Sequence, residues 1–365
     1  MKTVPFLDLG RLHQSIRTEL DAAFDEIVRS SAYIGAQTNT SFEEAFAAAH
    51  HRSHAVGCNS GTDAISLALR ALGVGPGDEV VVPSMTFFAT AEAVLHAGAQ
   101  PVLADVDPVT LLLDEARVEA VRTSATKAVL PVHLYGHVVP FDTLRTWRDS
   151  GLCVIEDAAQ AHLATDGDVA VGTMSSAATF SFFPGKNLGA LGDAGAIVTD
   201  DDEVAATMRR LRDHGRGDKY RHDEVGVSSR LDGLQAAFLA VKLRHLPEWT
   251  QSRRRLAEHY TEALAEVDGA TVVPYGAGAV HHLYVVQVDA EKRAEIRRAL
   301  SDAGVQTGVH YPIPLSGQPA LSHLATPTPN AEAAARQVLS LPIDPLMTTD
   351  EVAVVVSSLR DALAS

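Results

Sequence analysis

Lys186 is the first candidate for chemistry, because it lies between an apolar segment and a glycine-rich turn in SFFPGKNLGALGDAGAIVTDD, residues 181–201. A lysine held at the end of a packed strand loses hydration. This loss lowers the pKa of the amine and makes it a candidate nucleophile toward an aldehyde. Gly185 and Gly189 let the backbone pass close to a bound group. Taken alone, a lysine in such a turn lies on the surface more often than it takes part in catalysis.

A small polar turn, Asn59-Ser60-Gly61-Thr62, follows the apolar segment HAVGC and opens directly into a helical pattern. The first N–H groups of a helix are unpaired and lie at the positive end of its dipole, so such a turn suits a phosphate. An ordinary N-cap formed by Ser60 or Thr62 explains the same residues. The turn therefore predicts an anion site only in combination with other signals.

Two further segments place candidate residues directly after apolar strands. Glu156 and Asp157 end CVIED, where one carboxylate should point into the crevice at the edge of the sheet. That carboxylate could bind a metal, act as a general base or hold a cationic nitrogen. The alternative is the N-cap of a following helix, with Gln160 completing a capping box. Phe87 and Phe88 follow EVVVPSMT, and each taken alone fits the core.

Together these signals match one cofactor, pyridoxal phosphate. It needs a phosphate site, a carboxylate that keeps its pyridine nitrogen protonated, an aromatic ring over its own ring, and a lysine for its aldehyde. The chain supplies these groups in the order Gly61, Thr62, Phe87, Asp157, Ser181 and Lys186.

Competing motifs fail on their spacing. Lys186 precedes Asn187 and has no glycine five residues before it, so a Walker loop is excluded. In GVGPGD, Asp78 stands where a dinucleotide fingerprint needs its third glycine. His50 and His54 are four residues apart, but no glutamate lies between them and no third ligand follows. We therefore expect a solvated helix face there and no metal site.

The elements expected around these residues alternate between short apolar strands and amphipathic helices, which indicates an α/β protein with a mainly parallel sheet covered on both faces. Strands are expected at HAVGC, EVVVPS, QPVLADV, KAVLPVH, CVIEDA, ATFSFF and GAIVTD, with helices at 62–72, 89–97, 114–123 and 141–150. A long helix is expected from Arg230 to about Val267. Beyond it, TVVP, HLYVVQVD and GVQTGVHYP are predicted strands, and 292–303, 331–340 and 349–363 are predicted helices.

Composition and charge restrict the class of protein. The 365 residues are 46% hydrophobic and 21% charged, which is ordinary for a globular chain. The net charge of −16 would repel a phosphate backbone, so nucleic-acid binding is not expected. An anionic substrate would need local positive groups that override this field. No signal peptide or membrane-spanning segment is recognised, so we expect a cytoplasmic protein with no membrane partner.

The chain resembles the DegT/DnrJ/StrS family of pyridoxal-phosphate-dependent sugar aminotransferases nearly from end to end. The resemblance rests on VPFLDL, SGTDAISLALRALGVGPGDEVVVPSMTF, LPVHLYGH, VIEDAAQAH, FSFFPGKNLGALGDAG, SSRLDGLQAAFLAVKLRHL, VHYPIPL and VLSLP. It implies fold type I, in which a large domain with a mainly parallel seven-stranded sheet between helices precedes a small C-terminal α/β domain. We expect an N-terminal helix packed on the small domain at 1–30, the large domain at 31–246 and the small domain at 247–365.

The resemblance also implies roles for individual residues. Lys186 would bond to the cofactor and then move the proton at the substrate carbon. Asp157 would hold the pyridine nitrogen, Gln160 would contact the ring phenolate oxygen, and Phe87 would stack on the ring, whereas Phe88 would be core. The phosphate ligands would be Gly61, Thr62 and Ser181, and the residues near the sugar would be His310 and Tyr311.

A homodimer with shared active sites is implied as well, in which the loop with Ser228 and Arg230 reaches the partner's phosphate. Ser228 stands where the family usually has asparagine, so we expect a weaker contact to the cofactor. Two further departures, at 162–164 and 316–318, bear on substrate preference.

The function that this resemblance implies is transfer of an amino group from glutamate to a nucleotide-linked keto-deoxysugar. The segments FPGKNLGALGD and SRLDGLQAA most resemble the sequences of members that make 3-amino-dTDP-6-deoxyhexoses for antibiotics or surface glycans. The alternatives are a 4-keto-sugar or keto-cyclitol aminotransferase, a sugar dehydratase and a non-catalytic sensor. Lys186 argues against the dehydratase, because that branch of the family has histidine at this position.

Overall fold

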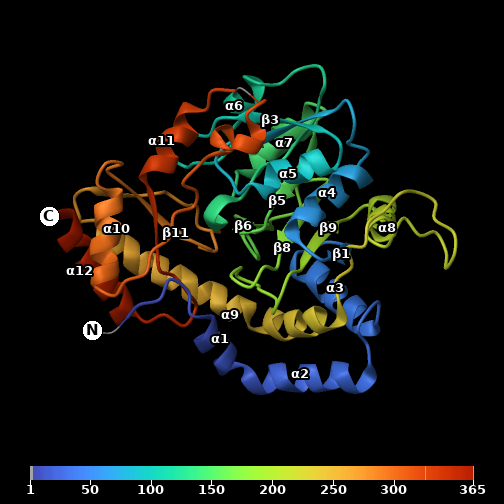
Figure 1. The fold of residues 1–365 in the computed structure, drawn as a ribbon, viewed down its shortest axis with the longest axis horizontal. Coiled ribbons are helices and arrows are strands. Elements are labelled where there is room, and N and C mark those ends of the chain that lie inside the picture. The colour runs from blue at the N-terminus through green and yellow to red at the C-terminus, as the bar shows by residue number, and fades with distance from the viewer. Residues whose placement is uncertain (1–2, 325, 365) are drawn as a thin grey trace.

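The centre of the molecule is a seven-stranded sheet with the strand order β1-β9-β8-β5-β4-β2-β3 (Figure 1). The computed structural model describes residues 3–324 and 326–364. Because β9 pairs antiparallel with both of its neighbours and the other strands run in parallel, the expected mainly parallel sheet is confirmed. The strands are β1 His54–Cys58, β2 Glu79–Pro83, β3 Gln100–Ala104, β4 Thr126–Val129, β5 Cys153–Asp157, β8 Ala177–Ser181 and β9 Gly195–Thr199.

Helices cover both faces of this sheet, which explains why its strands are apolar on both sides. In β2, Val81 packs into one core and Val80 and Val82 pack into the other, because successive side chains of a strand point to opposite faces. One face carries α4 Gly61–Ala71, α5 Ala89–His96 and α8 Asp202–Leu211. The other carries α3 Gln37–Ala49, α6 Glu115–Glu119 and α7 Phe141–Asp149.

A smaller antiparallel sheet follows in the C-terminal part of the chain, with the strand order β10-β11-β12. Its side chains share a separate core with α10 and α12. The elements of this part are β10 Ala270–Val272, β11 Tyr284–Val288, β12 Val338–Leu341, α10 Arg293–Asp302, α11 Pro329–Gln337 and α12 Thr349–Ala364. Short elements elsewhere are β6 Thr165–Asp166, β7 Val169–Ala170, η1 Leu134–Gly136, η2 Leu315–Gly317 and η3 Pro319–Leu321.

The long helix α9, Gly233–Leu264, joins the two parts and lies below the large sheet in the view of Figure 1. Its Leu239 packs into the core of the large sheet and its Tyr260 into the core of the small one. Pro247 lies inside this helix, next to the point where we place the division between two domains. That division remains a proposal.

The N-terminal helices α1 Leu9–Ser15 and α2 Arg17–Ser30 lie along α9 (Figure 1). Leu12, Ile16 and Leu20 pack there with Phe238 of α9, as their helical spacing indicates. No helix among residues 3–324 and 326–364 is long and apolar enough to cross a membrane.

Three sequence-based predictions are wrong. GVQTGVHYP is not a strand: Val305 and Gly308 form single bridges with Val4 and Ser340. The helix expected at 331–340 ends at Gln337, and the chain continues as β12. His50 does not lie on a solvated face, because it is fully buried against the rings of Phe46 and Phe180.

Candidate active site

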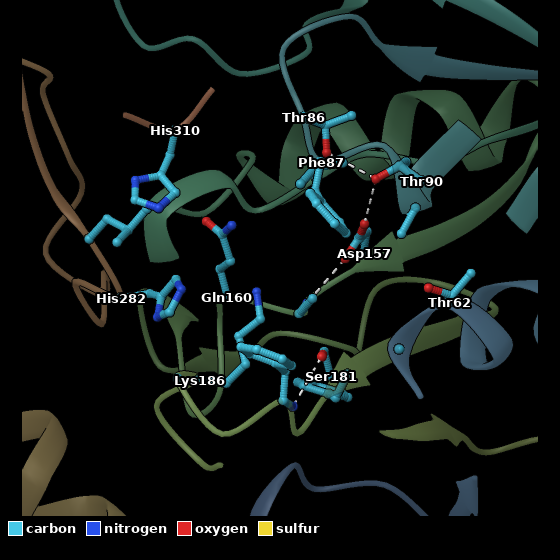
Figure 2. Close-up of a pocket in the computed structure, with 18 of the residues that line it drawn as sticks. Thr62, Thr86, Phe87, Thr90, Asp157, Gln160, Ser181, Lys186, His282 and His310 are labelled. Atoms are coloured by element: carbon cyan, nitrogen blue, oxygen red, sulfur yellow. Dashed lines mark hydrogen bonds between the residues drawn. The ribbon is translucent and has the colours of Figure 1, made fainter. Parts of the chain in front are cut away.

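A cavity of about 540 Å³ lies beside the ends of β5 and β8, and its other side is lined by Arg253 of α9 and by loop residues of the C-terminal part. Figure 2 shows side chains from these separate elements pointing into one space. The cavity brings together nine of the predicted site residues: Gly61, Thr62, Phe87, Asp157, Gln160, Ser181, Lys186, His310 and Tyr311.

Lys186 is held in a tight turn directly after β8. Its backbone N–H donates to Phe183 O at 2.8 Å, and a side chain at Gly189 would meet Pro184 O at 2.2 Å, so the turn requires glycine there. The Lys186 side chain points into the cavity (Figure 2). Desolvation by the surrounding protein lowers the pKa of its amine to about 8, although the Asp157 carboxylate opposes this shift. The amine is therefore partly neutral near neutral pH.

Asp157 ends β5 and is buried at the cavity wall. Its Oδ1 accepts from Ala159 N at 3.1 Å and its Oδ2 from Thr90 Oγ1 at 2.9 Å. Burial holds the pKa of Asp157 above its ordinary value, although these two hydrogen bonds and the charge of Lys186 oppose the rise. Turns follow β5 in place of a helix, so the N-cap alternative is wrong. A buried carboxylate with two donors is suited to hold a cationic nitrogen.

Glu156 turns to the opposite face of β5, as the alternation along a strand requires. It is fully buried, and its carboxylate accepts hydrogen bonds from Ser175 Oγ and Gly172 N. His133 Nε2 lies 2.7 Å from it. Of the two adjacent acids, only Asp157 therefore lines the cavity among the described residues.

Gln160 does not complete a capping box. Its side-chain oxygen accepts from Tyr135 N, and its Nε2 donates to the Tyr311 hydroxyl at 3.0 Å. These bonds fix the amide at the cavity wall between Asp157 and His310 (Figure 2).

The turn before α4 meets the end of β8 at the end of the cavity opposite His310 (Figure 2). A side chain on Gly61 would lie 2.7 Å from Ser181 Cβ, so the two segments approach too closely for any residue but glycine. Ser60 caps the helix by accepting from Asp63 N at 3.1 Å. The N–H groups of Gly61 and Thr62 have no partner in the described chain. The N-cap is therefore present, and it leaves these two N–H groups available for an anion.

The aromatic residues divide as expected. Phe88 packs against the core around α4, whereas the side chain of Phe87 is 57% exposed and lines the cavity. The centroids of the Phe87 and Tyr311 rings are 5.7 Å apart. An apolar ring left open beside Asp157 and Lys186, with free N–H groups at the far end, matches the groups that pyridoxal phosphate needs. The residues present therefore fit this cofactor.

Ser228 and Arg230 do not line this cavity. Arg230 donates to Asp213 Oδ1 at 2.7 Å and to Ser228 Oγ at 3.2 Å, and Ser228 is exposed. Their predicted contact with a phosphate therefore requires a second subunit. No group of three or more potential metal ligands occurs in the described part of the chain.

Four residues of this region were not predicted from the sequence: Thr90, Lys242, Arg253 and His282. Thr90 follows Thr86 by four residues, and this spacing, which the structure turns into a hydroxyl–hydroxyl distance of 2.9 Å, was the one local signal available. Lys242 and Arg253 lie in α9 and His282 lies just before β11, far along the chain from Lys186.

Lys242 of α9 supports the turn that carries Lys186. It is 1% exposed, its Nζ donates to Gly189 O at 2.6 Å, and His13 Nε2 lies 2.8 Å away. Burial lowers the pKa of Lys242 to about 8, and burial and the Lys242 charge lower the pKa of His13 to about 4. A neutral His13 can therefore accept a hydrogen bond from Lys242.

Lys242→Met is expected to weaken cofactor binding about tenfold, because the carbonyl of Gly189 loses its donor and the Lys186 turn loosens. Titration of the apoenzyme with pyridoxal phosphate measures this change. Arg244→Met is the matched control, since Arg244 lies on the same helix but forms an exposed ion pair with Glu19. Equal affinities in both variants would contradict the supporting role of Lys242.

Comparisons with known proteins agree with this geometry. The model of the DegT/DnrJ/EryC1/StrS aminotransferase family matches residues 14–360. The dTDP-3-amino-3,4,6-trideoxy-alpha-D-glucose transaminase of Streptomyces venezuelae is 45% identical, over 98% of this chain and 96% of its own. The erythromycin biosynthesis sensory transduction protein EryC1 of Saccharopolyspora erythraea is 46% identical, over 98% and 99%.

Two solved structures are similar over the whole chain. DesV of S. venezuelae, crystallised in complex with a ketimine intermediate, has a TM-score of 0.97 and 43% identity, with 100% of each chain covered. The ntda protein of Bacillus subtilis, with bound cofactor pmp, has a TM-score of 0.94 and 33% identity, with 100% of this chain and 86% of that chain covered.

Proposed function

The chain belongs to the DegT/DnrJ/EryC1/StrS aminotransferase family, and from this premise we propose that it transfers an amino group from glutamate to a dTDP-linked 3-keto-6-deoxyhexose. It is a pyridoxal-phosphate-dependent sugar aminotransferase of fold type I. The Lys186 amine, held beside Asp157 and opposite the free N–H groups of Gly61 and Thr62, is the observation that carries the proposal.

The residues that line the cavity would have separate roles in this reaction. When bound, pyridoxal phosphate supplies an electron sink for the carbon that carries the amino group. Gly61, Thr62 and Ser181 would hold its phosphate, and Asp157 would keep a proton on its ring nitrogen. Gln160 would donate to its phenolate oxygen.

Phe87 would cover one face of the cofactor ring and exclude water from it. Lys186 Nζ would take the proton from the donor carbon and return it to the sugar carbon, which a pKa of about 8 suits near neutral pH. His310 and Tyr311 lie on the same wall and would contact the sugar.

We also propose a homodimer with shared sites. The exposure of Ser228 and the position of Arg230 outside the cavity of its own subunit support this proposal, because both could then contact a second copy. Serine is shorter than asparagine, and the contact from Ser228 to a phosphate would be correspondingly weak.

The proposal is tested with purified holoenzyme, glutamate and four acceptors: a dTDP-3-keto-6-deoxyhexose, its 4-keto isomer, the corresponding UDP-linked 3-keto sugar and a keto-cyclitol. Mass spectrometry of the amino sugar and an assay for 2-oxoglutarate report the transfer. The proposal expects the highest kcat/KM with the dTDP-3-keto sugar. Faster turnover of the 4-keto sugar or the cyclitol, or loss of water without amine transfer, would replace it by the corresponding alternative.

A regulatory role is a second candidate, because the Saccharopolyspora erythraea relative is named a sensory transduction protein. The same experiment separates the two functions. A holoenzyme that binds the nucleotide sugars but turns over none of them would favour the regulatory role.

The pH dependence of cofactor loading provides a further prediction. Only the neutral amine attacks an aldehyde, so the rate at which the apoenzyme takes up pyridoxal phosphate should rise with pH and level off above the pKa of Lys186. The midpoint is expected near pH 8, well below the 10.5 of an ordinary lysine, because burial disfavours the charged amine. Stopped-flow absorbance between pH 6 and 10.5 measures it. A midpoint near 10.5 would show that Lys186 is hydrated like a surface lysine.

A further inference from the structure

Arg253 is a buried cation in the wall of the active-site cavity. It lies in the second half of α9, is 4% exposed, and lines the same cavity as Lys186 and His282. A guanidinium stays charged in a protein, and a buried charge is costly unless an anion or several acceptors compensate it.

The described protein compensates this charge only in part. Arg253 Nη1 donates to His281 O at 3.2 Å and to Ile343 O at 2.9 Å. The Nε and Nη2 groups have no hydrogen-bond partner among the described residues, and no carboxylate there lies within 4.0 Å of the guanidinium. Burial lowers the pKa of Arg253 to about 10, and the negative charge of Asp344 opposes this shift. The Asp344 carboxylate is, however, already paired with Arg11 at 3.4 Å. Three N–H donors therefore remain open.

Arg253 and Lys186 are linked through adjacent residues. Arg253 binds the carbonyl of His281, and the next residue, His282, places its Nδ1 3.2 Å from Asn187 Oδ1. Asn187 directly follows Lys186 in the chain. Burial lowers the pKa of His282, and the positive charges of Lys186 and Arg253 lower it further, so both lie within electrostatic reach of that ring. In Figure 2, His282 and Lys186 lie on the same side of the cavity.

The net charge of the whole chain disfavours the approach of an anionic substrate, so a fixed local cation would aid its binding. At −16, the protein repels a free amino-acid anion. A guanidinium edge formed by Nε and Nη2 matches the two oxygens of a carboxylate, and binding is strong where water is excluded.

We propose that Arg253 binds a carboxylate of the amino-acid donor and so directs the donor's amino group toward Lys186. This inference rests on the proposed aminotransferase function. The donor occupies the site in the first half of the reaction and leaves before the nucleotide sugar enters. Arg253 therefore acts on donor binding.

The test compares Arg253→Met and Arg253→Lys with the wild-type holoenzyme in the first half-reaction alone. Glutamate is added without sugar, and the absorbance of the pyridoxal form is followed. The glutamate concentration for half-maximal rate should rise about 100-fold in Arg253→Met and less in Arg253→Lys, which keeps a point charge.

Arg254→Met is the matched control. Arg254 is the neighbouring arginine of α9 and donates to Ala279 O at 2.9 Å and to Gly278 O at 3.1 Å, but it does not line the cavity. In Arg254→Met, the glutamate concentration for half-maximal rate is expected to stay within about threefold of the wild-type value.

Two further measurements separate donor binding from general damage. Calorimetry with glutarate, an unreactive dicarboxylate, should show binding to the wild-type holoenzyme that Arg253→Met loses and Arg254→Met keeps. In the second half-reaction, enzyme loaded with pyridoxamine phosphate should aminate the keto sugar with a much smaller loss in Arg253→Met than the first half-reaction shows.

Several outcomes would overturn the inference: no glutarate binding to the wild type, equal glutarate binding in Arg253→Met, or a loss confined to the second half-reaction. If the wild type reacts with another amino acid but not with glutamate, the proposed donor is wrong. The comparison of Arg253 with Arg254 then decides the inference with that amino acid.

Discussion

Lys186→Ala is expected to lower kcat for amine transfer by more than about 10⁴-fold, because one side chain supplies both the covalent link and the proton transfer. The variant should also lose the visible absorption band of pyridoxal phosphate bonded to lysine. Multiple-turnover assays with glutamate and the keto sugar, together with the absorption spectrum, measure both effects. The phosphate site and Asp157 are untouched in this variant, so pyridoxamine phosphate should still bind.

Lys242→Met is the control for this result, since desolvation lowers the pKa of Lys242 to about 8 as it does for Lys186. It contacts the back of the same turn without lining the cavity and should keep the absorption band. Lys186→Arg preserves the charge but not the nucleophile and should be nearly as inactive as Lys186→Ala. Transamination retained in Lys186→Ala would contradict the catalytic role assigned to Lys186.

The large sheet could be predicted from the sequence because its strands are buried on both faces. HAVGC, CVIED and GAIVTD are short apolar runs bounded by polar turns, and each became a strand. The direction of β9 could not be predicted in the same way, because a buried antiparallel strand has the same apolar pattern as a parallel one.

The errors in the C-terminal part have a different physical cause. Val305 is 1% exposed, and its alternation with polar neighbours imitates a strand. The segment instead lies between Val4 and the edge of β12 and makes one bridge to each. The valine and leucine of QVLSLP continue the helical spacing of α11, yet they pair with β11, so tertiary contacts override the local pattern.

The active site was predictable where its residues follow strands of the large sheet. Asp157 and Lys186 are separated by 29 positions in the chain, but β5 and β8 are neighbours, which brings the two side chains to one edge. Arg253 and His282 carried no comparable signal. They reach the cavity only because α9 and the loop before β11 pack across its open side, and a single sequence does not encode that packing in a local pattern.

Asp157→Asn is expected to lower kcat about 10²- to 10³-fold, because a proton on the cofactor's ring nitrogen loses its fixed counter-charge. The substitution changes little else. The asparagine oxygen can still accept from Ala159 N, and its amide can donate to Thr90 Oγ1, which now accepts from it and has Thr86 Oγ1 2.9 Å away for its own hydrogen. Both half-reactions should slow, and rapid-mixing absorbance measures each one separately.

Thr90→Val separates the charge of Asp157 from its orientation. This variant removes the hydrogen bond to Oδ2 but leaves the carboxylate charged, so kcat is expected to fall by only about tenfold.

The rate of cofactor loading of the apoenzymes is an independent measurement. The Asp157 charge raises the pKa of Lys186, so its removal in Asp157→Asn should move the midpoint of cofactor loading below pH 8. If Asp157→Asn leaves that midpoint and both half-reactions unchanged while Lys186→Ala is inactive, then Asp157 only shapes the strand end. The positive ring nitrogen would then need another partner.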